Sequence, residues 1–417
     1  MTSPIPDSDA GAKSLLRQRA FLSLLSARFL SVLAGQIQSV TIAWQIYAIA
    51  RLHSDVKHAA FAVGMVGLAQ FLPVFALTLT AGEMADRHDR KKIAAICAAA
   101  QALTAVVLTL LAHAGLSEVW PVYLVAAAFG AARVFLAPAS TAMAPMLVPR
   151  ALFPRAIAWS SLSMQGAQIL GPALGGLLCA VSPAVAYGAA VSLYAAACLT
   201  LLTIRARTHP DVQPGSRWAL VKEGLVYVWT NRIVFGAISL DLFAVLLGGA
   251  TALLPVFARD VLHVGAQGFG VLRSAPAIGA ACIAAILAVR PIRRKAGLVM
   301  FTGVAIFGAS TVVFALSKVL IVSVAALAVL GAADMLSVYV RQTLVQIVTP
   351  DPMRGRVAAV SSLFIGASNE LGEFESGMVA RLLGPVGSAL FGGVGALLVT
   401  GLWSQMFPAL RKADRLG

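Results

Sequence analysis

Long apolar segments alternate with short polar ones along the whole chain. Twelve of the apolar segments are each about long enough to cross the roughly 30 Å hydrocarbon core of a membrane as an α-helix. They lie near residues 21–48, 59–81, 93–113, 119–148, 157–181, 184–204, 233–257, 269–289, 297–316, 319–347, 357–382 and 386–407. The pattern therefore predicts an all-α integral membrane protein with twelve transmembrane helices.

The composition agrees with this interpretation, because 59% of the 417 residues are hydrophobic and only 12% are charged. Soluble domains carry about 25% charged residues. The longest connection, residues 205–232, begins polar and continues as a short amphipathic helix, which is typical of a hinge between two halves. We expect this organisation along the chain: a tail (1–20), a first six-helix half (21–204), a central loop (205–232), a second six-helix half (233–407) and a second tail (408–417).

The formal net charge of +15 is compatible with a nucleic-acid or anionic-lipid partner. The positions of the basic residues indicate another cause. With the N-terminus in the cytoplasm, 23 Lys and Arg residues fall on the cytoplasmic side of the membrane and five fall on the other side. This asymmetry follows the positive-inside rule and predicts that both termini are cytoplasmic. No basic stretch is interleaved with exposed aromatic residues as a nucleic-acid groove requires, so we expect no nucleic-acid partner.

The two halves of the chain resemble each other in sequence. Residues 130–161 align without a gap on residues 331–362 at a constant offset. In this alignment, an identical residue of the second half lies opposite each of Gly130, Ala131, Ala132, Pro149, Arg155, Ala158, Ser160 and Ser161. The repeat predicts two pseudo-symmetric six-helix halves related by an axis along the membrane normal. Such folds place the substrate site between the halves near the midplane, and they work by rocking one half against the other.

A dense charge cluster connects the second and third apolar segments, at residues 82–92. It must lie in water at a membrane face. The residues that we assign to a gate at this face are Gly82, Asp86, Arg87, Arg90 and Lys91, together with Arg356 in the loop 349–356 of the second half. Asp86 at the end of its helix is placed to face the positive N-terminus of a neighbouring helix and to pair with Arg90. The alternative is a solvated cluster that only sets the topology.

Two sequence patterns connect the chain to a known family. Residues 82–91 match the pattern of Gly, three residues, Asp, a basic residue, any residue, Gly and two basic residues, except that Asp89 replaces the second Gly. The fifth apolar segment carries the pattern Gly-Pro-x-x-Gly-Gly, as Gly171, Pro172, Gly175 and Gly176. With these patterns and its twelve segments, the chain resembles the major facilitator superfamily. Residues 241–255, 349–357 and 366–377 resemble its enterobactin-exporter and transmembrane-secretion-effector branch.

The resemblance implies a secondary active transporter that works by alternating access in the bacterial inner membrane. It favours a proton-coupled exporter of small organic molecules, either a siderophore or an amphipathic drug. One alternative is an uptake permease for a metabolite. Another is a membrane scaffold or lipid-handling protein without ion-coupled transport. In the fifth segment, plain close helix packing through small residues is an alternative to a moving hinge.

Charged residues inside apolar segments are costly in a membrane and therefore indicate function. The candidates for proton coupling are Asp241, Asp334, Glu370 and Glu373, and the candidate basic partners are Arg28, Arg133 and Arg341. The repeat aligns Arg133 with Asp334 and Arg28 with Asp241, which favours ion pairs between the halves. The alternative for each residue is a structural ion pair that never titrates.

Glu370 and Glu373 are the preferred proton carriers. Helical spacing places them on one stripe with Gly366 and Gly377, and Glu370 lies about 21 Å beyond Arg356 along a helix. A carboxyl group at that depth is desolvated, so we expect it to exchange protons near neutral pH. Asp334 is expected to pair with Arg133 instead.

Other chemistry is not indicated by the sequence. The chain lacks a GxxxxGK[ST] phosphate-binding loop, and its four cysteines lie in apolar segments without CxxC spacing. We therefore expect no ATP, no metal, no cofactor and no enzymatic activity. The expected partners are a small-molecule substrate, protons and the lipid bilayer, and the chain is expected to act as a monomer.

Overall fold

The computed structural model describes residues 15, 18–206, 208, 217–292 and 294–413. Within these ranges, eleven helices are long and apolar enough to cross a membrane. The first six are α2 (Arg19–His53), α3 (Val56–Arg87), α4 (Arg90–His113), α5 (Trp120–Met143), α6 (Phe153–Val181) and α7 (Pro183–Leu202). The others contain α9 (Arg232–Leu247), α11 (Gly265–Val289), α12 (Ala296–Leu316), α13 (Leu320–Val348) and α14 (Asp351–Met406).

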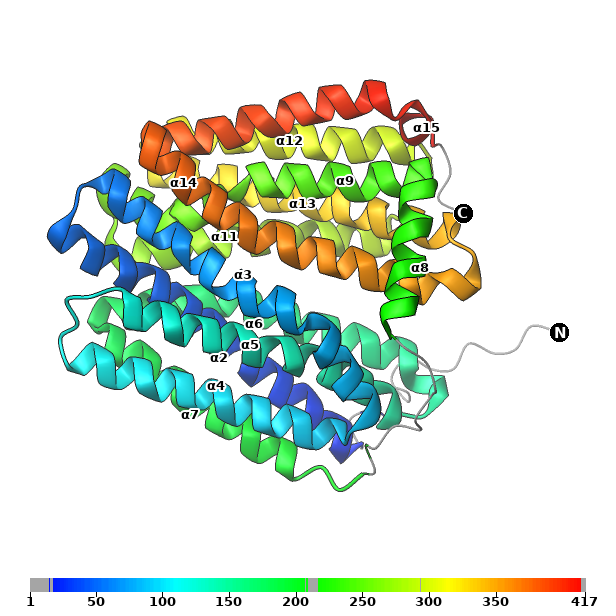
Figure 1. Ribbon diagram of the computed structural model, residues 1–417, viewed down its shortest axis with the longest axis horizontal. Coiled ribbons are helices and arrows are strands. Elements are labelled where there is room, and N and C mark those ends of the chain that lie inside the picture. The colour runs from blue at the N-terminus through cyan, green and yellow to red at the C-terminus, as the bar shows by residue number, and fades with distance from the viewer. Residues whose placement is uncertain (1–14, 16–17, 207, 209–216, 293, 414–417) are drawn as a thin grey trace.

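The last helix accounts for the difference between eleven and the predicted twelve. Gly384 inside α14 has a non-helical backbone with φ 79°, a conformation that glycine adopts at little cost, and Pro385 follows it. The turn divides α14 into two segments that fold back on each other, the orange and red helices of Figure 1. The described residues therefore contain the twelve predicted crossing segments, and the predicted all-α membrane fold is confirmed.

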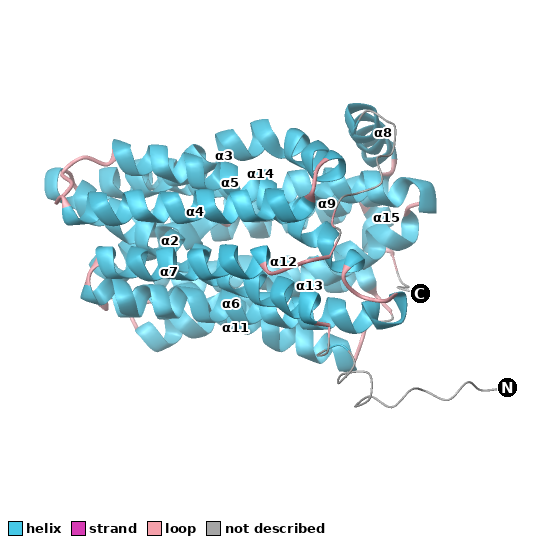
Figure 2. Cartoon of the chain, turned by 90° about the horizontal axis from the view of Figure 1, so that it is seen from below, coloured by secondary structure: helices cyan, strands magenta, loops and turns pink. Residues whose placement is uncertain are grey.

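The helices form two bundles that lie side by side (Figure 1). One bundle contains α2 to α7, and the other contains α9 and α11 to α14. The short helices α8 (Arg217–Thr230) and α15 (Pro408–Arg411) lie at the same end of the molecule, which we call the terminus side (Figures 1 and 2). The other end, which carries the α2–α3 connection and Gly384, is called the far side.

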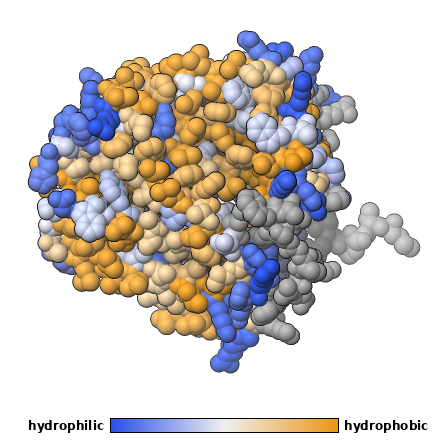
Figure 3. Space-filling model, in the orientation of Figure 1, coloured by the Kyte–Doolittle hydropathy of each residue, from blue (hydrophilic) through white to orange (hydrophobic). Residues whose placement is uncertain are grey.

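The outer surface has the distribution of polarity that a bilayer requires. Apolar residues cover the middle of the face in Figure 3, and hydrophilic residues gather toward its ends. Leu103 of α4, Leu124 of α5 and Leu199 of α7 are examples of exposed apolar residues, each more than 60% exposed. Exposed apolar side chains in such numbers would favour aggregation in water, whereas lipid solvates them.

One predicted segment, residues 233–257, is not a continuous helix. The helix α9 ends at Leu247 and is followed by the 3₁₀ turn η3 (Gly249–Leu253), the short helix α10 (Leu254–Val256) and the π-helical turn η4 (Phe257–Val261). The break falls where this segment contacts α14. A Cβ atom on Gly249 would lie 2.3 Å from the carbonyl oxygen of Gly372, so the backbones approach more closely there than any side chain permits.

Asp89 shows why the chain does not need the second glycine of the family pattern. It is the N-cap residue of α4, with φ −60°, and its carboxylate accepts a hydrogen bond from the Lys91 backbone N–H at 3.0 Å. Its carboxylate also accepts a hydrogen bond from the hydroxyl of Thr208. The connection therefore requires no left-handed backbone at this position.

The amphipathic helix of the central loop is α8, and it packs against the second bundle. Val228 is buried with Val357, and the Tyr227 hydroxyl donates a hydrogen bond to the Val348 carbonyl at 3.1 Å. Glu223 forms an ion pair with Arg356. Arg356, predicted in a loop, thus lies in the first turns of α14. The polar stretch predicted before this helix falls mostly outside the described residues.

Candidate functional site

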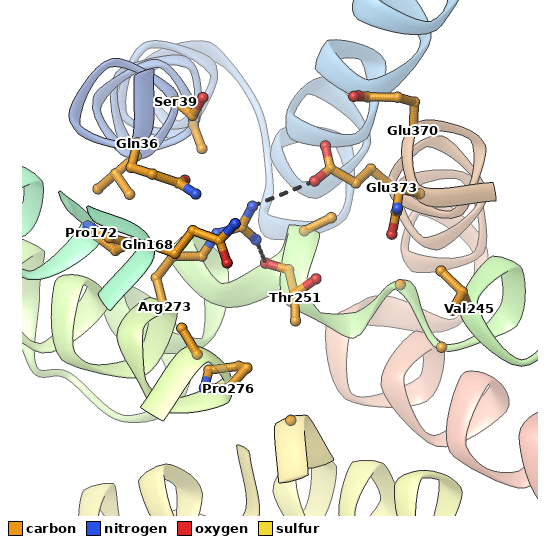
Figure 4. Close-up of a pocket in the computed structure, with 18 of the residues that line it drawn as sticks. Gln36, Ser39, Gln168, Pro172, Val245, Thr251, Arg273, Pro276, Glu370 and Glu373 are labelled. Atoms are coloured by element: carbon orange, nitrogen blue, oxygen red, sulfur yellow. Dashed lines mark hydrogen bonds and ion pairs between the residues drawn. The ribbon is translucent and has the colours of Figure 1, made fainter. Parts of the chain in front are cut away.

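A cavity of about 580 Å³ lies between the two bundles. Gln36 of α2, Arg133 of α5 and Gln168 of α6 line it from the first bundle, as expected for a substrate site between the halves. The second bundle contributes Arg273 of α11, Asp334 of α13 and both Glu370 and Glu373 of α14. Figure 4 shows part of this wall, with Glu373 and Arg273 turned toward each other.

The two bundles close against each other on the far side of the cavity. The Tyr47 hydroxyl donates a hydrogen bond to Asp260, and Arg51 forms an ion pair with the same carboxylate at 3.4 Å. The Lys57 ammonium donates to the Leu382 carbonyl at 3.2 Å. Among the described residues, the hydrogen bonds that join the bundles lie at the far side or at mid-depth.

Glycines bring the backbones of the two bundles together at the same level. A Cβ atom on Gly377 of α14 would lie 2.6 Å from the Cα atom of Gly64 of α3. A Cβ atom on Gly176 of α6 would lie 2.6 Å from the Cα atom of Gly270 of α11. Small residues permit such close helix packing in membranes. The far side of the cavity is therefore sealed by backbone contacts as well as by polar ones.

Arg133 and Glu370 form an ion pair between the bundles at mid-depth. The repeat in the sequence predicted Asp334 as the partner of Arg133, and the structure does not form that pair. The reason is the lateral order of the helices. The helix α14 packs against α3, beside α5, whereas α13, which carries Asp334, packs against α9, α11 and α12 of its own bundle.

Arg273 is a charged residue of the cavity that the sequence analysis overlooked. It forms an ion pair with Glu373 at 3.6 Å and donates a hydrogen bond to the Thr251 carbonyl at 3.0 Å, as the dashed lines in Figure 4 show. Thr251 belongs to η3, where the helix is broken. The signal was present, because Arg273 lies inside the predicted apolar segment 269–289.

Asp241 and Arg341 form a buried ion pair at 3.3 Å within the second bundle. The guanidinium of Arg341 also donates a hydrogen bond to the Ser361 hydroxyl at 3.1 Å. Only 2% of Arg341 is exposed. The aligned pair of Arg28 and Asp241, expected between the halves, is therefore not formed in this structure.

Asp334 differs from the other three candidate carboxylates. It lines the main cavity and also a small adjoining cavity shared with Asp241 and Ser337. It forms no ion pair or hydrogen bond with another residue in the described part of the chain. Glu370, Glu373 and Asp241 each form an ion pair with an arginine. Asp334 forms none among the described residues, although Arg341, the partner of Asp241, interacts with it electrostatically.

The gate residues lie at the terminus side and bind mostly within the first bundle. Asp86 and Arg90 form an ion pair with 4.0 Å between their nearest atoms. Arg90 also donates hydrogen bonds to the carbonyls of Ala85 and Ala142, both at 3.0 Å. Lys91 donates to the Ile204 carbonyl at 3.0 Å. Gly82 and Arg87 lie in the last turns of α3, where Arg87 pairs with Glu83 at 2.8 Å.

The environment of Asp89 in this connection changes the pKa of its carboxyl group. Partial burial acts to raise the pKa of Asp89. The hydrogen bonds from Thr208 and from the backbone N–H groups of Lys91 and Lys92 outweigh burial and lower the pKa below its usual value. The carboxylate is therefore ionised at neutral pH and can hold the connection in place.

The glycine motif of the fifth segment divides its contacts between the two bundles. Gly171 and Gly175 allow α6 to approach α2 closely, at Gln36 and Ile37. Gly176 makes the contact with α11 across the boundary between the bundles. These contacts favour the close-packing interpretation of the motif. Pro172 lies in the same helix and lines the cavity, where Figure 4 shows it.

Two helical bundles around a charged cavity that is sealed on one side form the architecture of a membrane transporter. Solved structures share this fold: a mutant of the nucleoside transporter NupG superposes with a TM-score of 0.73, covering 93% of this chain and 100% of that one at 16% identity. A bacterial homologue of the iron transporter ferroportin in the inward-facing state gives 0.66, with 93% and 98% covered at 16% identity. These similarities concern the fold alone.

The chain belongs to the transmembrane secretion effector family, whose model matches residues 10–416. It is similar to proteins named enterobactin exporter EntS. The relative from Citrobacter koseri is 26% identical over 401 residues, which are 96% of this chain and 94% of that protein. The relative from Escherichia coli (strain SE11) is 25% identical over the same length. The protein is therefore a multi-pass membrane transporter of the major facilitator type and not an enzyme.

Proposed function

We propose that this protein is a proton-coupled exporter of small organic molecules across the bacterial inner membrane. The observation that carries the proposal is the carboxylate of Asp334, which forms no ion pair with a described residue, on the wall of a cavity whose far side is closed. A transporter needs a site that each side reaches in turn, and coupling needs a group whose protonation changes between those states.

The orientation of the protein follows from the charges of its connections. Among the described residues, 18 Lys and Arg lie in or beside the connections at the terminus side and five lie at the far side, so the positive-inside rule assigns the terminus side to the cytoplasm. The cavity is then closed toward the periplasm and is in position to take substrate from the cytoplasm. This state is the loading state of an exporter.

We propose Asp334 as the proton carrier in place of Glu370 and Glu373, which the sequence favoured. Glu370 and Glu373 are engaged in ion pairs with Arg133 and Arg273. Asp334 lines the cavity and forms no ion pair with a described residue, so it is the carboxylate that we assign to the proton. The pair of Arg133 with Glu370 crosses the boundary between the bundles, so we assign it to sensing the rocking motion.

The substrate class is supported by the relatives and by the size of the site. Proteins named enterobactin exporter share 25–26% identity over nearly the whole chain, which favours a siderophore. A cavity of about 580 Å³ lies within the range of roughly 300–1,000 Å³ that holds small ligands. An amphipathic drug fits the same space and remains the second substrate class in the proposal.

The test uses inverted membrane vesicles that contain the full chain, with enterobactin and the amphipathic cation ethidium as probes. Wild-type vesicles should accumulate a probe when a proton gradient is applied. Asp334→Asn should abolish this accumulation and retain exchange down a substrate gradient, because the amide keeps the shape and loses the titration. Glu375→Gln is the matched control, since Glu375 lies on α14 away from the cavity lining. Normal accumulation by Asp334→Asn vesicles excludes Asp334 as the carrier.

A further inference from the structure

Arg28 of α2 is the intramembrane arginine that no ion pair explains. Arg133, Arg273 and Arg341 each bind a carboxylate. Arg28 forms no hydrogen bond or ion pair with any other residue that the structure describes. An unpaired guanidinium inside a membrane protein is costly, so its retention indicates a ligand.

Two side cavities of about 230 and 340 Å³ meet at Arg28. Both are lined by Arg28, Thr141 of α5 and Met164 of α6, so they adjoin at these residues, and we call the two together the Arg28 pocket. Arg133 lines the smaller part and also the main cavity. The Arg28 pocket therefore adjoins the proposed substrate site.

The Arg28 pocket lies between the main cavity and the terminus side. Arg28 is nine residues from the start of α2, which is about 14 Å along the helix. Phe153 and Ala156, in the first turn of α6, line its outer part. A molecule that enters from the terminus side therefore meets the outer part of this pocket before it reaches the main cavity.

The walls of the Arg28 pocket define the chemistry of its occupant. Apart from Arg28 and Arg133, the lining residues are apolar side chains such as Leu136 and Ile157 and a few hydroxyl groups. No acidic residue lines either part. Because Glu370 occupies the guanidinium of Arg133, Arg28 is the cation that remains for a ligand.

We propose that the Arg28 pocket binds the anionic group of an amphipathic organic acid, with the apolar part of the acid against Met164 and Ile157, as an entry site for the main cavity. The inference rests on the proposed function, because it names the class of molecule that the exporter accepts first. A guanidinium binds a carboxylate through two parallel hydrogen bonds, and an apolar surrounding strengthens them.

Direct binding tests the site independently of pumping. Radiolabelled octanoate is equilibrated with the full chain in phosphatidylcholine nanodiscs, and octan-1-ol and octylamine serve as uncharged and cationic competitors of the same chain length. Octanoate should bind, and the competitors should not displace it. Arg28→Gln should weaken octanoate binding by about tenfold or more. Arg290→Gln, an exposed arginine beyond the end of α11, is the matched control and should bind like wild type.

Two further variants keep the test decisive if Arg28→Gln does not fold. Arg28→Lys retains the charge and should retain part of the binding. Thr141→Asp places a carboxylate beside Arg28 and should abolish binding. Asp334→Asn should still bind octanoate after it has lost pumping, because Asp334 does not line the Arg28 pocket. Loss of pumping and loss of acid binding are thereby separated.

Changing the lipid of the nanodiscs shows whether the pocket binds a free organic acid or the headgroup of an anionic lipid. Repeating the measurement in nanodiscs that contain phosphatidylglycerol should leave octanoate binding unchanged. Displacement of octanoate by phosphatidylglycerol assigns the pocket to a lipid headgroup and overturns the proposal. Equal octanoate binding by wild type and Arg28→Gln overturns it as well.

Discussion

The phenol of Tyr47 donates a hydrogen bond to the carboxylate of Asp260, and this contact joins the first bundle to the second at the far side. Arg51 binds the other oxygen of the same carboxylate at 3.4 Å. Arg259, the neighbour of Asp260, lies 6.0 Å above the Tyr47 ring. Opening of the cavity toward the far side requires that these three contacts break together.

Asp260→Asn should shift the equilibrium toward the state that is open at the far side. The amide removes the ion pair with Arg51 and weakens the hydrogen bond from Tyr47, which together stabilise the closed state by about 1–2 kcal/mol. We expect faster labelling of a Ser39→Cys variant by an impermeant maleimide from the far side, in a chain without its native cysteines. Asp55→Asn is the control, because Asp55 caps α3 at the same side without a contact to the second bundle. Unchanged labelling in Asp260→Asn contradicts the assignment of a latch.

Gly377→Ala should destabilise the closed far side through backbone crowding. The new Cβ atom would meet the Cα atom of Gly64 at 2.6 Å, and neither backbone can move without separating α3 from α14. Overpacking of this kind costs about 1–3 kcal/mol. Thermal unfolding in detergent should show a lower midpoint than wild type. Gly188→Ala on α7, where nothing lies within 4 Å of the added atom, should match wild type or exceed it.

Reversing both charges of the pair formed by Arg133 and Glu370 should restore part of the transport that either reversal alone removes. The expected coupling energy is about 1 kcal/mol or more, because the two groups touch across the boundary between the bundles. Vesicle transport by Arg133→Glu, Glu370→Arg and the double variant measures it. The combination of Arg133→Glu with Asp334→Arg should not restore transport. Rescue by that combination would instead support the pair that the sequence repeat suggested.

Asp86→Asn should impair transport with little loss of folding stability. Asp86 is half-exposed and Arg90 keeps its bonds to two carbonyls, so the free energy of unfolding should change by no more than about 0.5 kcal/mol. Vesicle transport and the thermal midpoint are measured on the same preparation. Glu83→Gln, one turn earlier on α3, removes a comparable surface pair and should leave transport unchanged. Equal transport by Asp86→Asn and Glu83→Gln would mean that the charge cluster at residues 82–92 only sets the topology.

Reporter fusions test the orientation. A reporter that is active only in the cytoplasm should be active when it is fused after the last residue. A reporter that is active only in the periplasm should be active when it is inserted beside Lys318, in the connection between α12 and α13. The opposite result at either position contradicts the assignment of the terminus side to the cytoplasm.

The crossing segments were predictable because their length and apolarity are properties of the sequence alone. The break after Leu247 was not, since its cause is the close approach of Gly249 to Gly372, which only the folded chain creates. The charged candidates were predictable for a similar reason, because a charge in an apolar segment stands out. The partners of these residues were not predictable. The repeat predicts how deep Arg133 and Asp334 lie in the membrane, and it does not predict whether α13 or α14 lies nearer to α5.

The contacts on either side of the central connection show where the chain can be split into two polypeptides. Thr208 is 2% exposed and binds Asp89 of the first bundle, and Glu223 binds Arg356 of the second bundle. A chain cut between Thr208 and Arg217 leaves each fragment with its own anchoring contacts. Two separately encoded fragments, with the amphipathic helix on the second, should thus assemble into a working split transporter. The same division would let each fragment carry its own label for measuring the distance between them during turnover.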